Sequence, residues 1–264
     1  MIPSRVACLL VLMGCFAACP PARVDFGRDG EPRTADELLK RIELAETSVL
    51  TLTGEGKLFV DSPQGKGAVS IFTQVSHPSL VHLEQLDFFG KPQGVLTTDG
   101  ERFGLYDAQS AKYFQGPATP TNLGRFLPVV MPVTELTSLL LGRVPRIHPD
   151  ATQLRFDPAS GLFTLTLTRG SVVQTLSVSP PSYRVVKSAV VGLAAYGLEF
   201  GDLSTVGPVV FPRHVALDAA GVKTRVEITW KDVTLNQAPD LTLFELTGPE
   251  GVPVVDLDAA GVAK

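Results

Sequence analysis

Three cysteines near the N-terminus are the residues best suited to covalent chemistry: Cys8, Cys15 and Cys19. Cys15 and Cys19 each follow small residues at the end of an apolar run, which is the pattern of a cysteine thiol that bacteria modify with lipid. Cys19 follows two alanines and precedes Pro20-Pro21, so we expect lipidation at Cys19, with Cys15 or an unlipidated signal as the alternatives. No cysteine follows Cys19, which excludes disulfides and thiolate metal sites in the rest of the chain.

The residues around these cysteines resemble a secretory signal rather than part of a fold. Met1 to Arg5 is short and basic, and Val6 to Phe16 is apolar but too short to span a bilayer as a helix. We therefore expect a lipoprotein signal peptide over residues 1–18. The polar, glycine-containing stretch 19–33 is predicted to be a tether.

Other catalytic or metal-binding patterns are not found in the sequence. The four histidines lack metal-ligand spacing, and the sequence contains neither H-E-x-x-H nor G-x-S-x-G. His82 lies within a predicted strand, so we expect a structural role for it. Hydrophobic residues make up 44% of the chain and charged residues 19%, with a net charge of −4, which argues against disorder and against a nucleic-acid partner. We predict a non-enzymatic protein without a cofactor.

An unusual pair of aromatic residues, Phe88 and Phe89, stands in a predicted hairpin loop. The strand 80–86 precedes the pair, and Gly90, Pro92 and Gly94 then interrupt any regular strand. Loops normally run over the surface, and leaving a large apolar ring exposed forgoes roughly 1.5–3 kcal/mol of burial. Either the rings fold back onto the sheet, which we expect for Phe88, or Phe89 projects to contact acyl chains or a hydrophobic partner.

The elements that must position this loop are mostly strands. Thr34 and Glu37 form a capping box before a helix of about three turns. About eleven strands follow at intervals of roughly ten residues, which is typical of an antiparallel meander or barrel. Two helical segments, 122–127 and 133–141, interrupt them. The sequence predicts a mainly β, half-open antiparallel barrel over residues 34–246, with the helices covering its concave side, and a flexible tail over 247–264.

Such a sheet can enclose a lipid, and four side chains are candidates for lining the cavity. Leu139 and Leu140 lie on the apolar face of the second helical segment, whereas Phe163 and Trp230 alternate inward on strands. Phe163 and Trp230 are either core residues or part of a cavity wall. Arg125 and Arg143, which flank the helical insert, are either solvated charges or contacts for lipid phosphates.

The middle of the chain resembles the LolB family of outer-membrane lipoproteins. The resemblance rests on the apolar loop that ends at Gly90, and on the proline-flanked segment 126–142 with its short helix ending in Leu-Leu-Gly. LolB accepts lipoproteins from the soluble carrier LolA, and an apolar residue, usually leucine, projects from its loop. Phe89 stands at the matching position, directly before Gly90. The departures are a longer chain and phenylalanine in place of leucine.

The resemblance implies a monomer that is anchored by lipid in the outer membrane of a Gram-negative bacterium and faces the periplasm. The absence of aspartate directly after Cys19 favours the outer membrane in such systems. Expected partners are a LolA-like carrier and the acyl chains of lipoproteins or phospholipid. Two alternatives stay open: a lipid-binding envelope sensor without transfer activity, and a structural envelope lipoprotein with a packed interior.

Overall fold

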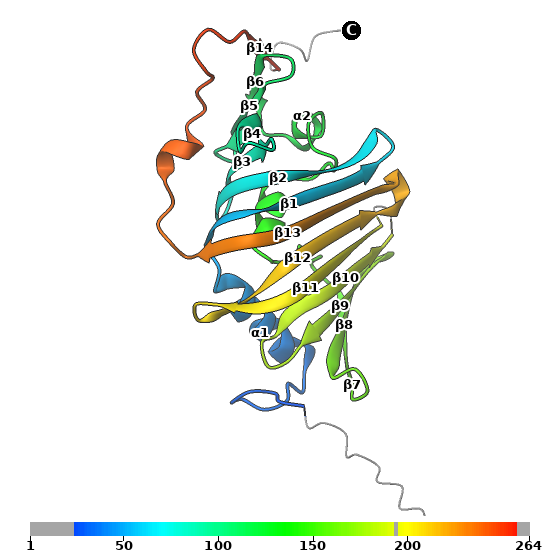
Figure 1. Ribbon diagram of the computed structural model, residues 1–264. Coiled ribbons are helices and arrows are strands. Elements are labelled where there is room, and N and C mark those ends of the chain that lie inside the picture. The colour runs from blue at the N-terminus through cyan, green and yellow to red at the C-terminus, as the bar shows by residue number, and fades with distance from the viewer. Residues whose placement is uncertain (1–23, 193–194, 258–264) are drawn as a thin grey trace, which may run out of the picture.

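The computed structural model describes residues 24–192 and 195–257, and in that part of the chain fourteen strands form one curved sheet (Figure 1). The strands are β1 Thr51–Ser62, β2 Gly65–Ser76, β3 Leu80–Leu86, β4 Pro92–Thr98, β5 Arg102–Asp107, β6 Lys112–Pro117, β7 Ala151–Asp157, β8 Leu162–Arg169, β9 Val172–Ser179, β10 Arg184–Val191, β11 Tyr196–Val206, β12 Val209–Ala219, β13 Thr224–Leu235 and β14 Val254–Asp256. The helices are α1 Ala35–Thr47, α2 Pro120–Leu123 and α3 Val133–Leu140, with 3₁₀ turns η1 Ala220–Val222 and η2 Leu241–Phe244. The prediction of a mainly β chain with few helices is confirmed.

The sheet consists of two antiparallel meanders that meet in its centre. The chain runs outward from β1 to β6, crosses to β7 at the opposite edge, and returns strand by strand to β13, which pairs with β1. A segment that joins the two edges must cross a face of the sheet. The crossing segment carries α2 and α3, and Figure 1 shows it in green behind β1 and β13. Its path explains why helices interrupt the strand pattern where they do.

Two of the fourteen strands were not predicted. β7 lies in a stretch to which the sequence assigned no element, and it forms one edge of the sheet against β8. β14 lies within the expected flexible tail, where its three residues pair in parallel with β6. The first helical segment is also shorter than expected, because α2 ends at Leu123. Residues Leu241–Phe244, near the end of the predicted barrel, form the 3₁₀ turn η2.

Helix α1 begins as its capping residues predict. The hydroxyl of Thr34 accepts a hydrogen bond from the backbone N–H of Glu37 (3.1 Å), and the Glu37 carboxylate accepts the N–H of Arg33 (2.7 Å). These bonds satisfy backbone donors that a helix N-terminus otherwise leaves free. Leu38 and Ile42, one turn apart, are fully buried against the sheet.

Residues 24–33, within the expected tether, lie against the sheet. The ring of Phe26 contacts those of Phe156 and Phe163, with centroids 5.2 and 5.8 Å apart. The hydroxyl of Tyr183 donates to the Phe26 carbonyl (2.7 Å), and the Arg41 guanidinium donates to the Gly30 carbonyl (2.6 Å). This stretch is thus fixed to the fold by an aromatic cluster and by polar contacts.

Two apolar cores form on the sheet, and α3 contributes to both. Leu139 belongs to the core that α1 forms with β8 to β12. Val133 and Leu140, with Leu141 directly after the helix, belong to the core of β1 to β5, β12 and β13. The α2–α3 segment thus lies between two cores.

Close contact between β1 and β13 depends on Gly56. The register of this pair shifts between Glu55 and Gly56, and the indole of Trp230 lies against Gly54 and Gly56. A Cβ at Gly56 would lie 2.6 Å from the carbonyl oxygen of Thr229 and 3.2 Å from Trp230. Both contacts involve the backbone of the paired strand, which cannot move aside without breaking the ladder.

We expect Gly56→Ala to lower the free energy of unfolding by about 1–3 kcal/mol, the usual cost of overpacking. Gly67→Ala, on β2, is a matched control, because a Cβ there would have no atom within 4 Å. Urea denaturation followed by tryptophan fluorescence measures both variants. Equal stability of the two variants would contradict the assignment.

Candidate functional site

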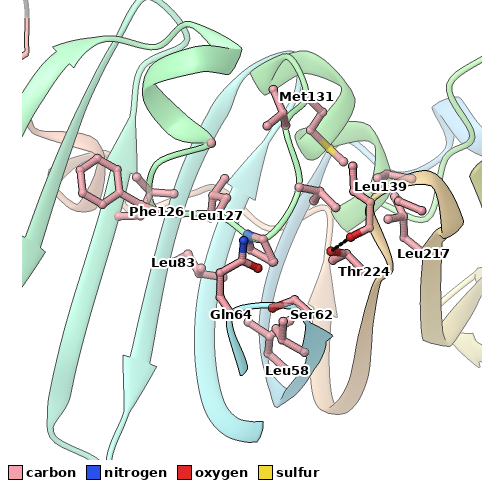
Figure 2. A pocket seen from close by; sticks show the side chains of 18 of the residues that line it. Leu58, Ser62, Gln64, Leu83, Phe126, Leu127, Met131, Leu139, Leu217 and Thr224 are labelled. Atoms are coloured by element: carbon pink, nitrogen blue, oxygen red, sulfur yellow. Dashed lines mark hydrogen bonds between the residues drawn. The ribbon is translucent and has the colours of Figure 1, made fainter. Parts of the chain in front are cut away.

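A large cavity lies between the sheet and the α2–α3 segment, with a volume of about 1580 Å³ (Figure 2). The crossing segment lines it with every residue from Gly124 to Met131 and with Leu139 of α3. The sheet lines it with side chains that alternate inward, such as Leu58, Leu83 and Leu217. Because most of these side chains are apolar, the cavity is suited to a hydrophobic ligand larger than most small molecules, whose pockets measure roughly 300–1,000 Å³.

The cavity reaches one end of the sheet, which we call the mouth end. The turns 62–65 and 219–224 both line the cavity. They lie at the same end because Asp61 pairs with both Lys66 of β2 and Arg225 of β13. The loop 87–91 between β3 and β4 lies at this end too, next to the cavity-lining residues Gln85 and Gly94.

Phe88 and Phe89 project from that loop. Their exposed fractions are 96% and 82%, and the two rings touch edge to face with centroids 5.5 Å apart. Asp87 organises the turn, because its Oδ1 accepts the N–H groups of Phe89 (2.8 Å) and Lys91 (2.9 Å). Gly90 has a φ of +77°, a conformation that glycine adopts without strain. The expectation that Phe88 packs onto the sheet is therefore wrong, and both rings are presented to solvent.

Two further exposed apolar side chains lie at the mouth end, and a third lies in the crossing segment. Val222, in the turn between β12 and β13, is 60% exposed, and Val191, at the end of β10, is 64% exposed. Val130, in the crossing segment, is 69% exposed. Val130 and Val222 also line the cavity. The apolar surface thus continues from the cavity to the outside at the end where the aromatic pair projects.

The predicted lining residues occupy different places. Leu139 lines the large cavity. Leu140 is buried in the β1–β5 core and Phe163 in the aromatic cluster around Phe26. Trp230 is buried and borders a smaller pocket of about 520 Å³ next to Glu55 and Lys57. Cys19, Cys15 and the signal peptide lie outside the described residues.

Sequence reasoning did not single out the residues of the crossing segment that line the cavity, namely Phe126, Leu127, Val129 and Met131. The signal for them was present, since an apolar run broken by prolines cannot continue a helix and still needs a surface to cover.

Few charged side chains line the cavity. Glu135 of α3 does so: the residue is exposed, and partial desolvation raises the pKa of its carboxyl group. Tyr196 also lines it, and its pKa is raised by burial and by the Glu135 charge. Arg125 and Lys66 are the cationic residues of the lining. Arg143, the other arginine considered for lipid phosphates, is instead buried and donates to the Val49 carbonyl.

His82 lies on the opposite face of the sheet from the cavity, since its neighbour Leu83 lines the cavity and strand side chains alternate. Its ring is buried between Thr97 (Nδ1 to Oγ1, 3.0 Å) and Glu84 (Nε2 to Oε1, 2.8 Å). The ring therefore bridges β3 and β4 as part of the structure.

No protein-family model matches the chain, and its sequence matches no curated protein. None of the helices in the described part of the chain is long and apolar enough to cross a membrane.

Solved structures do match its fold. A LolA superfamily protein from Nitrosomonas europaea is 11% identical with a TM-score of 0.53, and the match covers 81% of this chain and 98% of that one. A domain from Vibrio parahaemolyticus, provisionally described as an outer membrane lipoprotein-sorting protein, is 10% identical with a TM-score of 0.54, over 79% of this chain and 94% of that one. A DUF1329 family protein from Desulfovibrio piger gives the same identity and TM-score, over 79% and 95%. The chain therefore has a LolA-like fold, a large open and mostly antiparallel sheet.

Proposed function

We propose that this protein binds the acyl chains of lipoproteins and helps to insert them into the outer membrane, as a lipid-anchored acceptor that faces the periplasm. The observation that carries the proposal is the cavity of about 1580 Å³, which is mostly apolar and reaches the end of the sheet where Phe88 and Phe89 project. Its donor would be a soluble LolA-like carrier. The likeness to the LolA superfamily protein and to the lipoprotein-sorting domain supports the fold that such a role requires.

Acyl chains set the physical requirement for such a transfer. Burying a chain gains roughly 0.8 kcal/mol per CH₂, so burying a hexadecanoyl chain gains on the order of 12 kcal/mol. The chain therefore cannot be exposed to water during its transfer from one cavity to the other. Transfer then needs a continuous apolar path and a small difference in affinity between two cavities. Val222, which lines the cavity and is exposed, supplies such a path at the mouth end, and Val130 is a second exposed lining residue on the crossing segment.

The anchor would be a lipid on Cys19. Such a lipid would hold the protein at the membrane, and exposed apolar side chains add to membrane binding in proportion to the apolar area that they bury. We propose that exposed apolar residues at the mouth end, above all Phe89, supply a further contact with the membrane or with the carrier. In this arrangement the cavity opens toward the surface that receives its cargo.

Native mass spectrometry of the unlipidated mature chain tests the binding step. Added mass that matches a fatty acid, a phospholipid or a supplied acylated peptide supports the proposal. A mass that stays unshifted when acylated peptide is supplied would overturn it and favour a purely structural envelope protein. Binding without transfer from a loaded LolA-like carrier to vesicles would leave a lipid-binding sensor in place of the acceptor.

A further inference from the structure

A carboxylate stands in the apolar cavity without a counter-charge. Glu135 lies one turn before Leu139 on α3, Met131 precedes the helix, and all three line the cavity. Among the described residues that line it, Glu135 is the single acidic side chain. An acidic residue interrupts an otherwise apolar row, at a position where a leucine would serve a purely hydrophobic cavity better.

The surroundings of Glu135 leave its charge available to a ligand. No described residue forms a hydrogen bond or an ion pair with its side chain, and burial alone is the cause of its raised pKa. Tyr196 lines the same cavity, and the Glu135 charge contributes to raising the pKa of its phenol. A carboxylate and a phenol hydroxyl therefore both belong to the cavity wall.

The cations that line the cavity do not neutralise this carboxylate. Lys66 is bonded to Asp61 at 2.7 Å, and its ammonium lies over the ring of Phe59. Arg125 lies in the crossing segment, and no ion pair joins it to Glu135 among the described residues. When acyl chains displace water from the cavity, an unpaired carboxylate would lose its hydration, which is costly unless the ligand brings a donor.

Resting on the proposed function, we propose that Glu135, assisted by Tyr196, is a selectivity site for acyl amphiphiles that carry a cationic amine beside their chains. An ammonium placed against the carboxylate would form an ion pair in a medium of low dielectric constant. Its N–H donors would replace the hydrogen bonds to water that the carboxylate loses. A ligand that carries its own carboxylate would be repelled at the same place. The site would thus select cargo by the charge of its polar end, while the rest of the cavity binds the acyl chains.

Three probes with the same hexadecyl chain isolate the polar end: hexadecylamine, hexadecanol and hexadecanoate, each used below its micelle concentration. Their dissociation constants for the unlipidated chain are measured at neutral pH by displacement of a fluorescent fatty-acid analogue. We expect the amine to bind about tenfold more tightly than the alcohol, and hexadecanoate to bind most weakly. Glu135→Gln should reduce the amine preference to about twofold or less, since an amide carries no charge to attract the ammonium.

Tyr196→Phe should weaken the amine preference by a smaller factor. Glu55→Gln is the matched control, because Glu55 borders the smaller pocket and does not line the large one. The preference should also fall as the pH is lowered through the pKa of Glu135, which burial places above the ordinary value of 4.5. The alcohol, which has no charge, should show no such dependence.

The outcomes separate this inference from the proposal on which it rests. Equal binding of the three probes, or a preference unchanged by Glu135→Gln, overturns the selectivity site and leaves acyl-chain binding standing. Tightest binding of hexadecanoate also overturns it and points to Arg125 as the group that orients the cargo. Failure of the wild-type chain to bind any probe overturns both.

Discussion

Replacing Phe89 with glutamate should slow the delivery of acylated cargo to membranes by about ten- to a hundredfold, while the fold stays intact. The factor follows from the roughly 1.5–3 kcal/mol gained when a phenylalanine ring leaves water, since each 1.4 kcal/mol is a factor of ten. In the free protein the Phe89 ring is 82% exposed, so that gain is still available to a membrane or a carrier. A charged side chain at the tip loses the gain and adds a desolvation cost.

Because Phe89 is exposed, its replacement should leave the stability of the fold nearly unchanged. A residue with so little burial contributes little to the core, so we expect the free energy of unfolding to change by less than about 0.5 kcal/mol. Phe88→Glu should behave alike, because Phe88 is exposed as well. Leu241→Glu, in η2, is the matched control: Leu241 is 66% exposed but does not line the cavity.

The measurement is the rate at which a fluorescent acylated peptide moves from the loaded protein to lipid vesicles. Undiminished transfer by Phe89→Glu would remove the role of the loop. A loss of transfer shared equally by Leu241→Glu would mean that any added charge disturbs the reaction, and the loop would then have no special part in it.

The sequence predicted the loop that carries both rings but not the direction in which Phe88 points. Gly90 and Pro92 break the strand alternation, and this signal located the loop. Whether a ring in a loop folds back depends on the geometry of the turn, and here Asp87 fixes that geometry by accepting two backbone N–H groups. Aspartate at the start of a turn is a recognisable signal of such capping. It could have indicated a rigid projecting turn that holds Phe88 away from the sheet.

The two strands that were not predicted lack a local signal for different reasons. β7 is bracketed by Pro149 and Pro158, and it stays in place because β8 pairs with it along its whole length. β14 has three residues, and its partner on β6 lies more than a hundred positions earlier in the chain. A parallel contact of that range depends on where the preceding segment travels, which hydrophobic periodicity does not report.

Apolar periodicity likewise identifies inward-facing residues without showing which of them border empty space. Leu139 and Phe163 both read as inward, and both are buried. Phe163 is surrounded by the rings of Phe26, Phe156 and Tyr183, so no space remains beside it. Leu139 faces the gap that the crossing segment leaves above the sheet. The cavity is thus a property of the packing between segments.

A buried charge network fixes the crossing segment where it meets α1 and the sheet. Glu46, in the last turn of α1, is 4% exposed, and its carboxylate accepts the N–H of Val144 (3.0 Å) and pairs with Arg146. Arg143 donates to the Val49 carbonyl, and Arg184 of β10 donates to the Ser48 hydroxyl (3.2 Å). The arginines thus also satisfy acceptors where α1 ends, at which cations are favoured.

The network contains more positive than negative charge. Burial lowers the pKa of Arg184 to about 10 and also lowers that of Arg143, while the charge of Glu46 opposes both shifts. Arg143 Nε and Arg184 Nη1 have no hydrogen-bond partner among the described residues. Glu46 is therefore the anion that offsets the positive charge of Arg143, Arg146 and Arg184.

Glu46→Ala should accordingly lower the free energy of unfolding by about 3–5 kcal/mol, the cost of leaving buried charges uncompensated. Glu46→Gln keeps an acceptor for Val144 but removes the charge, so an intermediate loss is expected. Glu43→Ala is the matched control, because Glu43 lies on the exposed side of the same helix and should change stability by less than about 0.5 kcal/mol. Urea midpoints of the three variants measure the series. A Glu46→Ala midpoint equal to that of Glu43→Ala would mean that water reaches and solvates the arginines, and that the crossing segment is held by its apolar contacts alone.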